Sequence, residues 1–451
     1  MPQPPLLIVV LAAGMGVRMR SRRPKVLHQL AGRSLLGHAL ARAQVGGASQ
    51  IAVVVGPDMD AVRAEVLAHA ATAEVFEQAR QVGTADAVLA ARPALERHRG
   101  DVLVLFADTP LIEAATIEQL TATLAQGANI AVLGFKPEDP TGYGRLLVDA
   151  RGRVTAIREH KEASAAERAQ PLCNAGAMAF RVPSFVDLIA RIGNANAAKE
   201  YYLTDAVALA SSEGLIALPV VCSPQEAMGI NTREQLARAE SIFQARARAK
   251  AMREGVTMIA PETVWLSYDT AFGRDVTIEP NVFFGPGVVV ADGAEIGANS
   301  HIVGARIGEG ARVGPFARLR PGADVGAHVH IGNFVEVKNA SLEAGAKANH
   351  LAYIGDGRVG AGANIGAGAI FCNYDGFNKH FTDVGKGAFI GSNAALVAPV
   401  KIGDGAYVAS GSVISRNVEP DALAIARGTQ ELRPGWAAKF RALMQSRKKR
   451  S

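Results

Sequence analysis

The chain has 451 residues, of which 49% are hydrophobic, and its 48 Lys and Arg residues slightly outnumber its 42 Asp and Glu. Its length and apolar content exclude a largely disordered chain and predict more than one folded domain. Four of the basic residues form the run Arg447 to Arg450. Such a run is more typical of a solvated end than of a nucleic-acid site, so we expect no nucleic-acid partner.

The cysteines and the N-terminus predict where the protein resides. Cys173, Cys222 and Cys372 are scattered, without the spacing of metal ligands, which indicates a reducing compartment. The first apolar run leads directly into a glycine loop, as a strand does and a signal peptide does not. Because no apolar stretch is long enough to span a membrane, we expect a soluble, cytoplasmic protein with no membrane partner.

The first 230 residues alternate between strand-like and helix-like segments. Aliphatic strands are predicted at 6–11, 51–55, 102–106 and 130–133, with stretches rich in Ala and Leu between them. This alternation predicts an α/β fold in which helices cover a mostly parallel sheet. Ligands of such sheets lie beyond the carboxyl ends of the strands.

A glycine loop, Gly14-Met15-Gly16, follows the first strand and suggests phosphate binding through backbone N–H groups. It is not the dinucleotide fingerprint, because Arg18 and Met19 occupy the stretch where a third glycine would stand. Arg18 and Lys25 can supply positive charge to a polyphosphate, although they can also be two solvated surface cations.

Asp108 ends an otherwise apolar strand. A carboxylate at the tip of a buried strand needs a partner, and we favour a magnesium ion that bridges phosphates. The alternative is an N-cap, which Thr109-Pro110 makes plausible.

Residues 233–253 contain no Gly or Pro and predict one long helix that acts as a spacer. After it, an aliphatic or aromatic residue recurs every six positions, which predicts a parallel β-helix with three hexads per coil. The recurring residues are Ile278, Phe284, Val290, Ile296, Ile302, Ile307, Val313, Leu319, Val325, Ile331, Val337, Ile354, Val359, Ile365, Val384, Ile390, Leu396, Ile402, Val408 and Ile414.

Two breaks in this register, 339–353 and 371–383, are predicted to leave the stack as functional insertions. The first contains His350. A lone histidine is usually a surface residue, but His350 stands beside aromatic and amide groups, which makes it a candidate functional residue.

The motifs resemble a known family. Leu11 to Met19 and Pro24-Lys25-Val26-Leu27-His28 are similar to the signature of sugar-1-phosphate nucleotidyltransferases. Asn349-His350-Leu351-Ala352-Tyr353 and Cys372-Asn373-Tyr374-Asp375-Gly376 resemble the acetyltransferase half of the GlmU family. These are bifunctional N-acetylglucosamine-1-phosphate uridyltransferases and glucosamine-1-phosphate acetyltransferases. The resemblance covers nearly the whole chain.

The resemblance implies a Rossmann-like nucleotidyltransferase domain at 1–232, a helical linker at 233–253, and a left-handed parallel β-helix of hexapeptide repeats at 254–451. It implies synthesis of UDP-N-acetylglucosamine, first by acetylation with acetyl-CoA and then by uridylyl transfer from UTP with Mg²⁺.

For the uridyltransferase, the resemblance implies a set of binding residues. Arg18 and Lys25 would be catalytic phosphate ligands, and Asp108 and Asn231 would hold Mg²⁺. The nucleotide and the sugar would be held by Leu11, Ala12, Ala13, Gly14, Gln78, Gly83, Thr84, Phe106, Ala107, Gly144, Glu159 and Asn174.

For the acetyltransferase, it implies His350 as the general base. Arg320, Lys338, Tyr353 and Asn364 would bind the sugar phosphate. Acetyl-CoA would be held by Ala367, Asn373, Tyr374, Ser392, Ser410 and Arg427, at a site between the protomers of a trimer. We also expect small residues, Ala311, Ala317, Ala323 and Ala344, on the flat outer faces, where copies of the chain could pack closely.

The chain departs from the family at Val17, Phe106 and Ala107, and we expect Phe106 and Ala107 to change ligand affinity more than reaction type. Two other hypotheses remain. The β-helix could be a regulatory module, although a scaffold has no need of His350 or Asn373-Tyr374. The chain could also be a non-catalytic interaction protein, against which the intact Arg18, Lys25 and Asp108 argue.

Overall fold

The computed structural model describes residues 4–448, so Lys449 and Arg450 of the basic run lie outside the described residues. The chain forms two compact units, Met1–Ala249 and Lys250–Ser451. Within residues 4–448, no helix has both the length and the apolar composition needed to cross a membrane.

The first unit contains the predicted sheet. The four predicted strands are present as β1 (Leu6–Leu11), β4 (Gln50–Val55), β6 (Asp101–Phe106) and β7 (Ile130–Phe135). They join β5 (Glu74–Glu77), β10 (Cys173–Phe180) and β11 (Ala217–Cys222) in the order β11-β7-β10-β6-β1-β4-β5. The strand β10 runs antiparallel to both its neighbours, which the chain order does not predict.

A hairpin of β8 (Arg145–Val148) and β9 (Val154–Arg158) extends the sheet from β10. A smaller hairpin pairs β2 (Gln29–Leu30) with β3 (Arg33–Ser34). The helices of this unit are α1 (Leu35–Val45), α2 (Asp60–His69), α3 (Thr84–Ala90), α4 (Arg92–Arg97), α5 (Ala114–Ala125), α6 (Ala165–Arg168), α7 (Phe185–Ala190) and α8 (Asp205–Ser212).

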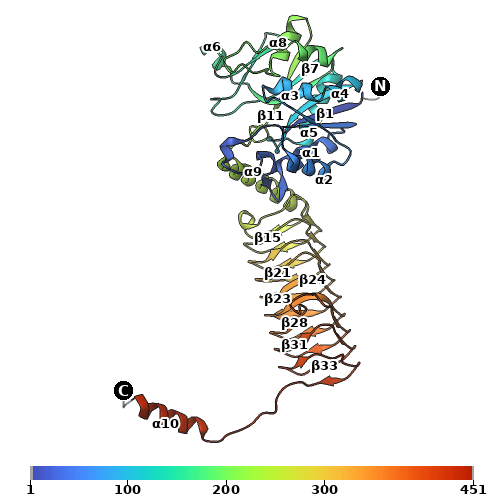
Figure 1. Cartoon of the computed structure of the whole chain (residues 1–451), viewed down its shortest axis with the longest axis vertical. Coiled ribbons are helices and arrows are strands. Elements are labelled where there is room, and N and C mark those ends of the chain that lie inside the picture. The colour runs from blue at the N-terminus through green and yellow to red at the C-terminus, as the bar shows by residue number, and fades with distance from the viewer. Residues whose placement is uncertain (1–3, 449–451) are drawn as a thin grey trace. The chain divides into compact units, whose positions relative to one another are not determined.

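The central strands are buried on both faces. Ile8 and Val10 of β1 belong to one core cluster, whereas Leu7 and Val9 belong to the cluster on the opposite face. Helices therefore cover the sheet on two sides, which explains the continuous aliphatic run of this strand (Figure 1). Because both faces of these strands are apolar, polar side chains can lie only at the ends of the strands.

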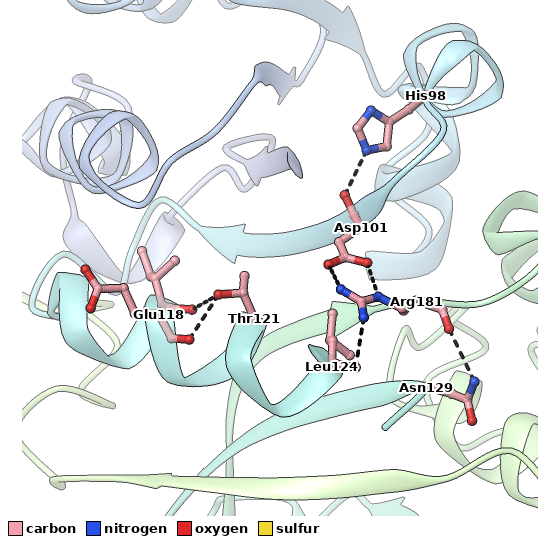
Figure 2. A network of polar contacts seen from close by, with 8 residues as sticks. His98, Asp101, Glu118, Thr121, Leu124, Asn129 and Arg181 are labelled. Atoms are coloured by element: carbon pink, nitrogen blue, oxygen red, sulfur yellow. Dashed lines mark hydrogen bonds and ion pairs between the residues drawn. The ribbon is translucent and has the colours of Figure 1, made fainter. Parts of the chain in front are cut away.

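An ion pair joins two strands at the edge where β6 begins. Figure 2 shows Arg181, just after β10, donating to both carboxylate oxygens of Asp101 at 2.7 and 2.6 Å. Arg181 also donates to the Leu124 carbonyl at 3.0 Å. A bidentate pair of this kind fixes the register of the antiparallel strands β6 and β10 at the edge of the sheet where β1 and β6 begin. The glycine loop lies at the opposite edge, because it follows the end of β1.

The predicted long helix is present as α9 (Arg233–Arg253), but its first part is more than a spacer. Ala239 is fully buried in a cluster with Leu30 and Ile230 of the first unit. Arg246 donates to the Leu111 carbonyl at 2.9 Å. The prediction of a charged spacer is wrong here, because a sparse apolar stripe of Leu, Ala, Ile and Phe is sufficient to pack one face.

The second unit is the predicted parallel coil, with its turns stacked from β15 (Phe283–Phe284) to β33 (Tyr407–Val408) (Figure 1). Ile278 pairs with Ile296, and Ile390 with Val408, each 18 residues further along. Three hexads therefore make one coil. All twenty recurring residues predicted for the core are at most 5% exposed.

These short strands form three faces. The first face has β12 (Thr257–Met258), β14 (Thr277–Ile278), β17 (Glu295–Ile296), β20 (Arg312–Val313), β23 (His330–Asn333), β25 (Lys347–His350), β27 (Asn364–Ile365), β30 (Phe389–Ile390), β33 and β35 (Leu423–Ala424). The second has β15, β18 (His301–Ile302), β21 (Arg318–Leu319), β28 (Ile370–Cys372), β31 (Ala395–Val397) and β34 (Val413–Ile414).

The third face has β13 (Ala271–Phe272), β16 (Val289–Val290), β19 (Ala305–Ile307), β22 (Ala323–Val325), β29 (Thr382–Val384) and β32 (Val400–Ile402). Two longer strands, β24 (Glu336–Leu342) and β26 (Tyr353–Val359), pair with strands of both the second and the third face, so each turns a corner. Helix α10 (Trp436–Lys448) follows the last coil.

One predicted insertion is wrong. Residues 339–353 stay in the stack, where Leu342 pairs with Val325 and Ala348 pairs with Ile331. The hexad register slips by one residue between Val337 and Leu342, and a small alanine then takes the core position. The second predicted insertion is present, because the chain leaves the coil between β28 and β29.

The alanines expected on the outer faces are mostly inside the coil. Ala311, Ala317 and Ala323 are at most 2% exposed, whereas Ala344 is exposed. The first three fill the corners beside the large core residues, where a longer side chain would not fit. The expected close packing of copies through these alanines is therefore wrong.

Candidate functional sites

A pocket of about 240 Å³ lies where β1 and β6 end in the first unit. Ten of the residues predicted to bind the nucleotide, the phosphates or the metal line it, namely Leu11, Ala12, Ala13, Gly14, Lys25, Gln78, Gly83, Thr84, Phe106 and Asp108. They come from segments nearly 100 residues apart, which the parallel pairing of β1 with β4 and β6 brings to one edge. The structure therefore brings these ten residues to one cavity, whereas the other predicted residues of this site, Arg18, Ala107, Gly144, Glu159, Asn174 and Asn231, do not line it.

The two glycines of the loop have different roles. Gly16 has a left-handed φ of 65°, and a Cβ there would lie 2.3 Å from the Lys25 Cβ. Gly14 has no heavy atom within 4 Å of the place its Cβ would take. Gly16 is thus required by the protein itself, whereas the space beside Gly14 is open to a ligand.

Lys25 lies at the centre of the polar groups. Its Nζ donates to Asp108 Oδ2 at 2.6 Å and to Asn231 Oδ1 at 3.0 Å, and the residue is only 8% exposed. The alternative that Asp108 caps a helix is wrong, because the next helix, α5, begins at Ala114. Lys25 is not a solvated cation, whereas Arg18 is exposed.

The two expected metal ligands converge on one point. Asp108 Oδ2 and Asn231 Oδ1 both contact the same ammonium, which holds the position a cation would take. Among residues 4–448, no three His, Cys, Asp or Glu side chains gather as a metal cage. One carboxylate and one amide oxygen fit Mg²⁺, which completes its shell with water and substrate phosphates.

The three residues expected to hold the acetylated sugar lie together. The Asn174 N–H donates to the Gly144 carbonyl at 2.8 Å, and a Cβ on Gly144 would lie 3.5 Å from the Glu159 carboxylate. Burial, followed by the charges of Glu162 and Asp205, raises the pKa of Glu159. This acidic group can accept hydrogen bonds from sugar hydroxyls.

Phe106 and Ala107, two positions where the chain departs from the family, point in different directions. Phe106 lines the pocket and packs against Gly176, whose Cβ would lie 3.3 Å from the ring. Ala107 is fully buried, and its methyl belongs to the core cluster. The side chain of Ala107 therefore does not narrow the pocket, and Ala107, although predicted as a binding residue, does not line it.

Some lining residues were not predicted, namely Val26, Gln81, Ala87 and Glu200. Gln81 donates from its amide to the Ala13 carbonyl and so closes the loop over the first strand. Gln81 begins the segment Gln81-Val82-Gly83-Thr84, and Glu200 begins Glu200-Tyr201-Tyr202-Leu203-Thr204-Asp205. Both segments also resemble the family, and this resemblance was the available signal.

In the second unit, His350 lies on an edge of the coil. It ends β25, is exposed, and its Nδ1 is 2.8 Å from Asn333 Oδ1 in the coil before it. When Nδ1–H donates to this oxygen, the lone pair of Nε2 remains free to accept a proton. His350 is therefore held by the stack itself and not by an insertion.

The predicted acetyl-CoA residues continue along this edge. The Gly368 N–H donates to the His350 carbonyl, and the Asn393 N–H to the Ala367 carbonyl. The Gly411 N–H donates to the Ser392 carbonyl, and the Arg427 side chain to the Ser410 carbonyl at 2.8 Å. His350, Ala367, Ser392, Ser410 and Arg427 thus follow one another on successive coils.

The predicted sugar-phosphate residues flank this edge. Arg320, Lys338 and Tyr353 follow or form strands of the second face, whereas Asn364 lies in β27 of the first face. Arg320 forms an ion pair with Glu336 at 2.8 Å. The structure therefore brings three of the four to one face and leaves Asn364 across the edge from them.

Two lysines and one carboxylate meet near the corner where β24 and β26 turn from the second face to the third. Lys338 lies beside Lys379, and its hydrogen bond and positive charge lower the pKa of Lys379. Burial raises the pKa of Asp356, but hydrogen bonds from Asn339 and Asn373, with the charges of the two lysines, lower it overall. Lys379 was not among the predicted site residues, yet this cluster has a net positive charge that suits an anion.

The loop between β28 and β29 carries Asn373 and Tyr374. Asp375 organises it by accepting from the N–H groups of Phe377 and Asn378 at 2.8 and 2.6 Å and from His380 at 2.7 Å. Tyr374 is 61% exposed, so its ring is available to a ligand.

The chain matches known families over both units. The MobA-like NTP transferase domain matches residues 8–173. The bacterial transferase hexapeptide family matches 304–339 and 381–416, and the hexapeptide repeat of succinyl-transferase matches 275–304. The fold and these matches define a nucleotidyltransferase joined to a hexapeptide-repeat transferase.

Among curated proteins, the bifunctional protein GlmU of Bradyrhizobium sp. (strain ORS 278) is 58% identical over 435 residues, which cover 96% of this chain and 97% of the relative. GlmU of Azorhizobium caulinodans is 56% identical over 97% of each chain, and that of Paramagnetospirillum magneticum is 53% identical over 98% of each. The chain belongs to the GlmU family of bifunctional enzymes. The prediction of one chain with uridyltransferase and acetyltransferase activities that make UDP-N-acetylglucosamine is confirmed.

Proposed function

We propose that the pocket of the first unit transfers uridylyl from UTP to N-acetylglucosamine-1-phosphate. A phosphate oxygen of the sugar attacks the α-phosphorus of UTP, the bond to the β-phosphate breaks, and pyrophosphate leaves. The attacking oxygen is already anionic, so the site needs alignment and positive charge more than a general base. The observation that carries this proposal is the convergence of Lys25 with Asp108 and Asn231 beside the glycine loop.

In this proposal Lys25 and the exposed Arg18 bind the phosphates, and the backbone beside Gly14 approaches them. Gln78 and Thr84 hold the nucleotide, while Gly144, Glu159 and Asn174 hold the sugar. Asp108 and Asn231 would hold Mg²⁺, which supplies positive charge to the phosphate oxygens when it is bound. Lys25 then exchanges its contacts with the two oxygens for contacts with phosphate.

We further propose that the edge of the coil acetylates glucosamine-1-phosphate. The amine nitrogen attacks the thioester carbonyl of acetyl-CoA, and His350 Nε2 accepts the amine proton. The C–S bond then breaks, and CoA leaves as a thiol after it takes this proton from the imidazolium. The sugar phosphate is bound by four side chains on one side of the edge, Arg320, Lys338, Tyr353 and Lys379, and by Asn364 on the other side. Ala367, Asn373, Tyr374, Ser392, Ser410 and Arg427 bind acetyl-CoA.

The edge is open on one side, because His350, Ser392, Ser410 and Arg427 are all exposed. We therefore propose that a homotrimer completes it, with a neighbouring coil as the second wall. A reducing, cytoplasmic location accords with three free cysteines. No nucleic-acid or membrane partner is part of the proposal.

One assay tests both reactions. The purified protein is given glucosamine-1-phosphate, acetyl-CoA, UTP and Mg²⁺, and free thiol and pyrophosphate are followed together. We expect thiol release to precede pyrophosphate release, and pyrophosphate alone to cease when Mg²⁺ is chelated. Pyrophosphate release at the full rate without any divalent cation would contradict the metal part of the proposal.

A further inference from the structure

The expected metal ligand Asn231 lies in a short segment between β11 and α9, outside both elements. Its Oδ1 accepts from Lys25 Nζ at 3.0 Å, and within residues 4–448 no other hydrogen bond holds this side chain. When a metal ion takes the place of the ammonium, the direction of Oδ1 must therefore be set by the backbone of Asn231.

Two hydrogen bonds hold that backbone. Ile230, which is fully buried, donates its N–H to the Asp108 carbonyl at 2.8 Å. The Asn231 N–H donates to Gln235 Oε1 at 2.7 Å. The first bond joins the segment to the other expected metal ligand, whereas the second joins it to the first turn of α9.

Gln235 belongs to a capping box at the start of α9. Thr232 Oγ1 accepts from the Gln235 N–H at 3.2 Å, and Gln235 Oε1 accepts from the Thr232 N–H at 3.1 Å. This reciprocal pair is what the pattern Thr-x-x-Gln provides at a helix N-terminus. The bond from Asn231 is additional to it, and is the shorter of the two that Oε1 accepts.

A second capping box, in α6, shows that helix capping does not require this additional bond. Glu167 Oε2 accepts from the Ser164 N–H at 2.8 Å and from the Ser164 hydroxyl at 2.9 Å. The preceding N–H, that of Ala163, donates instead to the Glu159 carbonyl at 3.0 Å. The contact between Gln235 and Asn231 is therefore a feature of this site and not of capping boxes in general.

Helix α9 can support this contact because it is packed on the first unit. Its Ala239 is fully buried, and its Glu240 accepts from the Ala31 N–H at 2.8 Å. Gln235 is itself half-buried. A hydrogen bond from this helix therefore fixes Asn231 relative to the core of the unit that forms the pocket.

We propose that Gln235 is a positioning residue for uridylyl transfer, which fixes the backbone of Asn231 so that its Oδ1 faces the divalent cation. The inference rests on the proposed function, in which Asp108 and Asn231 hold Mg²⁺. Because the protein supplies only these two ligands, misdirection of one of them weakens the hold on the metal. Groups that orient a metal ligand typically contribute about 10- to 100-fold in metal affinity.

The test measures binding of Mn²⁺ to the full chain by electron paramagnetic resonance, with UDP-N-acetylglucosamine at saturation. Gln235→Met keeps a similar volume but lacks the acceptor oxygen, and should raise the dissociation constant of Mn²⁺ by about 10- to 100-fold. Uridylyl transfer should require correspondingly more Mg²⁺, and its rate should recover toward wild type when Mg²⁺ is raised. Thiol release from acetyl-CoA should not change.

Two variants of the same capping box separate positioning from helix capping. Gln235→Glu keeps an acceptor oxygen with the same reach, and should bind Mn²⁺ at least as tightly as the wild type. Thr232→Ala removes the hydroxyl acceptor but leaves the Asn231 bond, so it should lower the melting temperature without weakening Mn²⁺ binding. If Thr232→Ala weakens Mn²⁺ binding as much as Gln235→Met does, the effect belongs to the cap and the inference is wrong.

Wild-type Mn²⁺ affinity in Gln235→Met would also overturn the inference. If that variant does not fold, Gln235→Asn takes its place, because its shorter side chain is polar but does not reach the Asn231 N–H, and the same result there has the same meaning. Asn231→Ala tests the proposed function separately. Wild-type Mn²⁺ affinity in Asn231→Ala would refute the expected metal site, whereas weaker binding there and unchanged binding in Gln235→Met would refute only the role of Gln235.

Discussion

The Cβ that Gly16 lacks would lie 2.3 Å from the Cβ of Lys25. The glycine therefore allows the loop after β1 to pass directly over the backbone that carries the lysine. Lys25 is thereby positioned, almost fully buried, to donate hydrogen bonds to Asp108 and Asn231. Gly16 thus sets the position of Lys25, the central cation of the pocket.

We expect Gly16→Ala to lower the kcat/KM of uridylyl transfer by at least about 10-fold, because the left-handed φ alone costs roughly 1–2 kcal/mol with a Cβ. The added clash displaces Lys25. Acetyl transfer, measured as thiol release, should stay at the wild-type level. Gly14→Ala is the matched control: it meets no protein atom within 4 Å, so it should affect UTP binding without lowering thermal stability.

Asp108→Ala should strongly reduce pyrophosphate release while thiol release stays near wild type. The substitution removes one of two oxygens expected to hold Mg²⁺ and leaves a buried Lys25 without its ion-pair partner at 2.6 Å. We expect a loss on the order of 10²–10³ in kcat, as when a group that stabilises transition-state charge is removed. Loss of both activities in a folded variant would contradict two independent sites.

His350→Ala should have the opposite effect. Thiol release should fall by on the order of 10²–10⁴, the usual contribution of a general base, and uridylyl transfer to N-acetylglucosamine-1-phosphate should survive. Asn333→Ala should cause a smaller loss, because the base remains but its ring loses the hydrogen bond at 2.8 Å. Acetylation within a few-fold of wild type in His350→Ala would mean that another group, or water, takes the proton.

Glu159 links stability to pH. Burial, then the charges of Glu162 and Asp205, raise its pKa above the ordinary 4.5, so the native state holds this proton more tightly than the unfolded chain does. The stability it contributes is complete below pH 4.5 and is lost as the pH rises through the folded value. Glu159→Gln should therefore melt at a higher temperature than wild type at pH 7.

The same variant should bind the sugar phosphate less well, since a charged acceptor is lost. Thermal unfolding from pH 4 to pH 8 tests the first effect, and the KM of N-acetylglucosamine-1-phosphate tests the second. If Glu159→Gln melts at the wild-type temperature at every pH, Glu159 has the same pKa in the folded and the unfolded state.

Much of the molecule could be predicted because its signals are local. The six-residue period identified every core residue that was named, and the glycine loop with Lys25 identified one end of the pocket. The stack continues through residues 339–353, but the sequence conceals this. Val337 and Leu342 are one residue closer than the six-residue period requires, and the next core position holds the small Ala348, so the segment looks like an insertion.

Other features depend on distant residues. The antiparallel course of β10 follows from its connections, which no local pattern records. The direction of the Ala107 methyl depends on which strand face meets the core. Lys379 lies beside Lys338 only because the loop between β28 and β29 folds back over the coil.

The coil repeats by translation, since residues one turn apart occupy the same corner and pair in parallel. Removing or duplicating one whole turn therefore leaves every remaining side chain in its own register, and changes the length of the prism by one strand spacing, about 4.8 Å. The number of turns between Lys250 and His350 can thus vary in discrete steps without redesign of the core. Evolution or engineering can therefore change the length of the coil by whole turns without changing the residues that carry out the chemistry at either end of it.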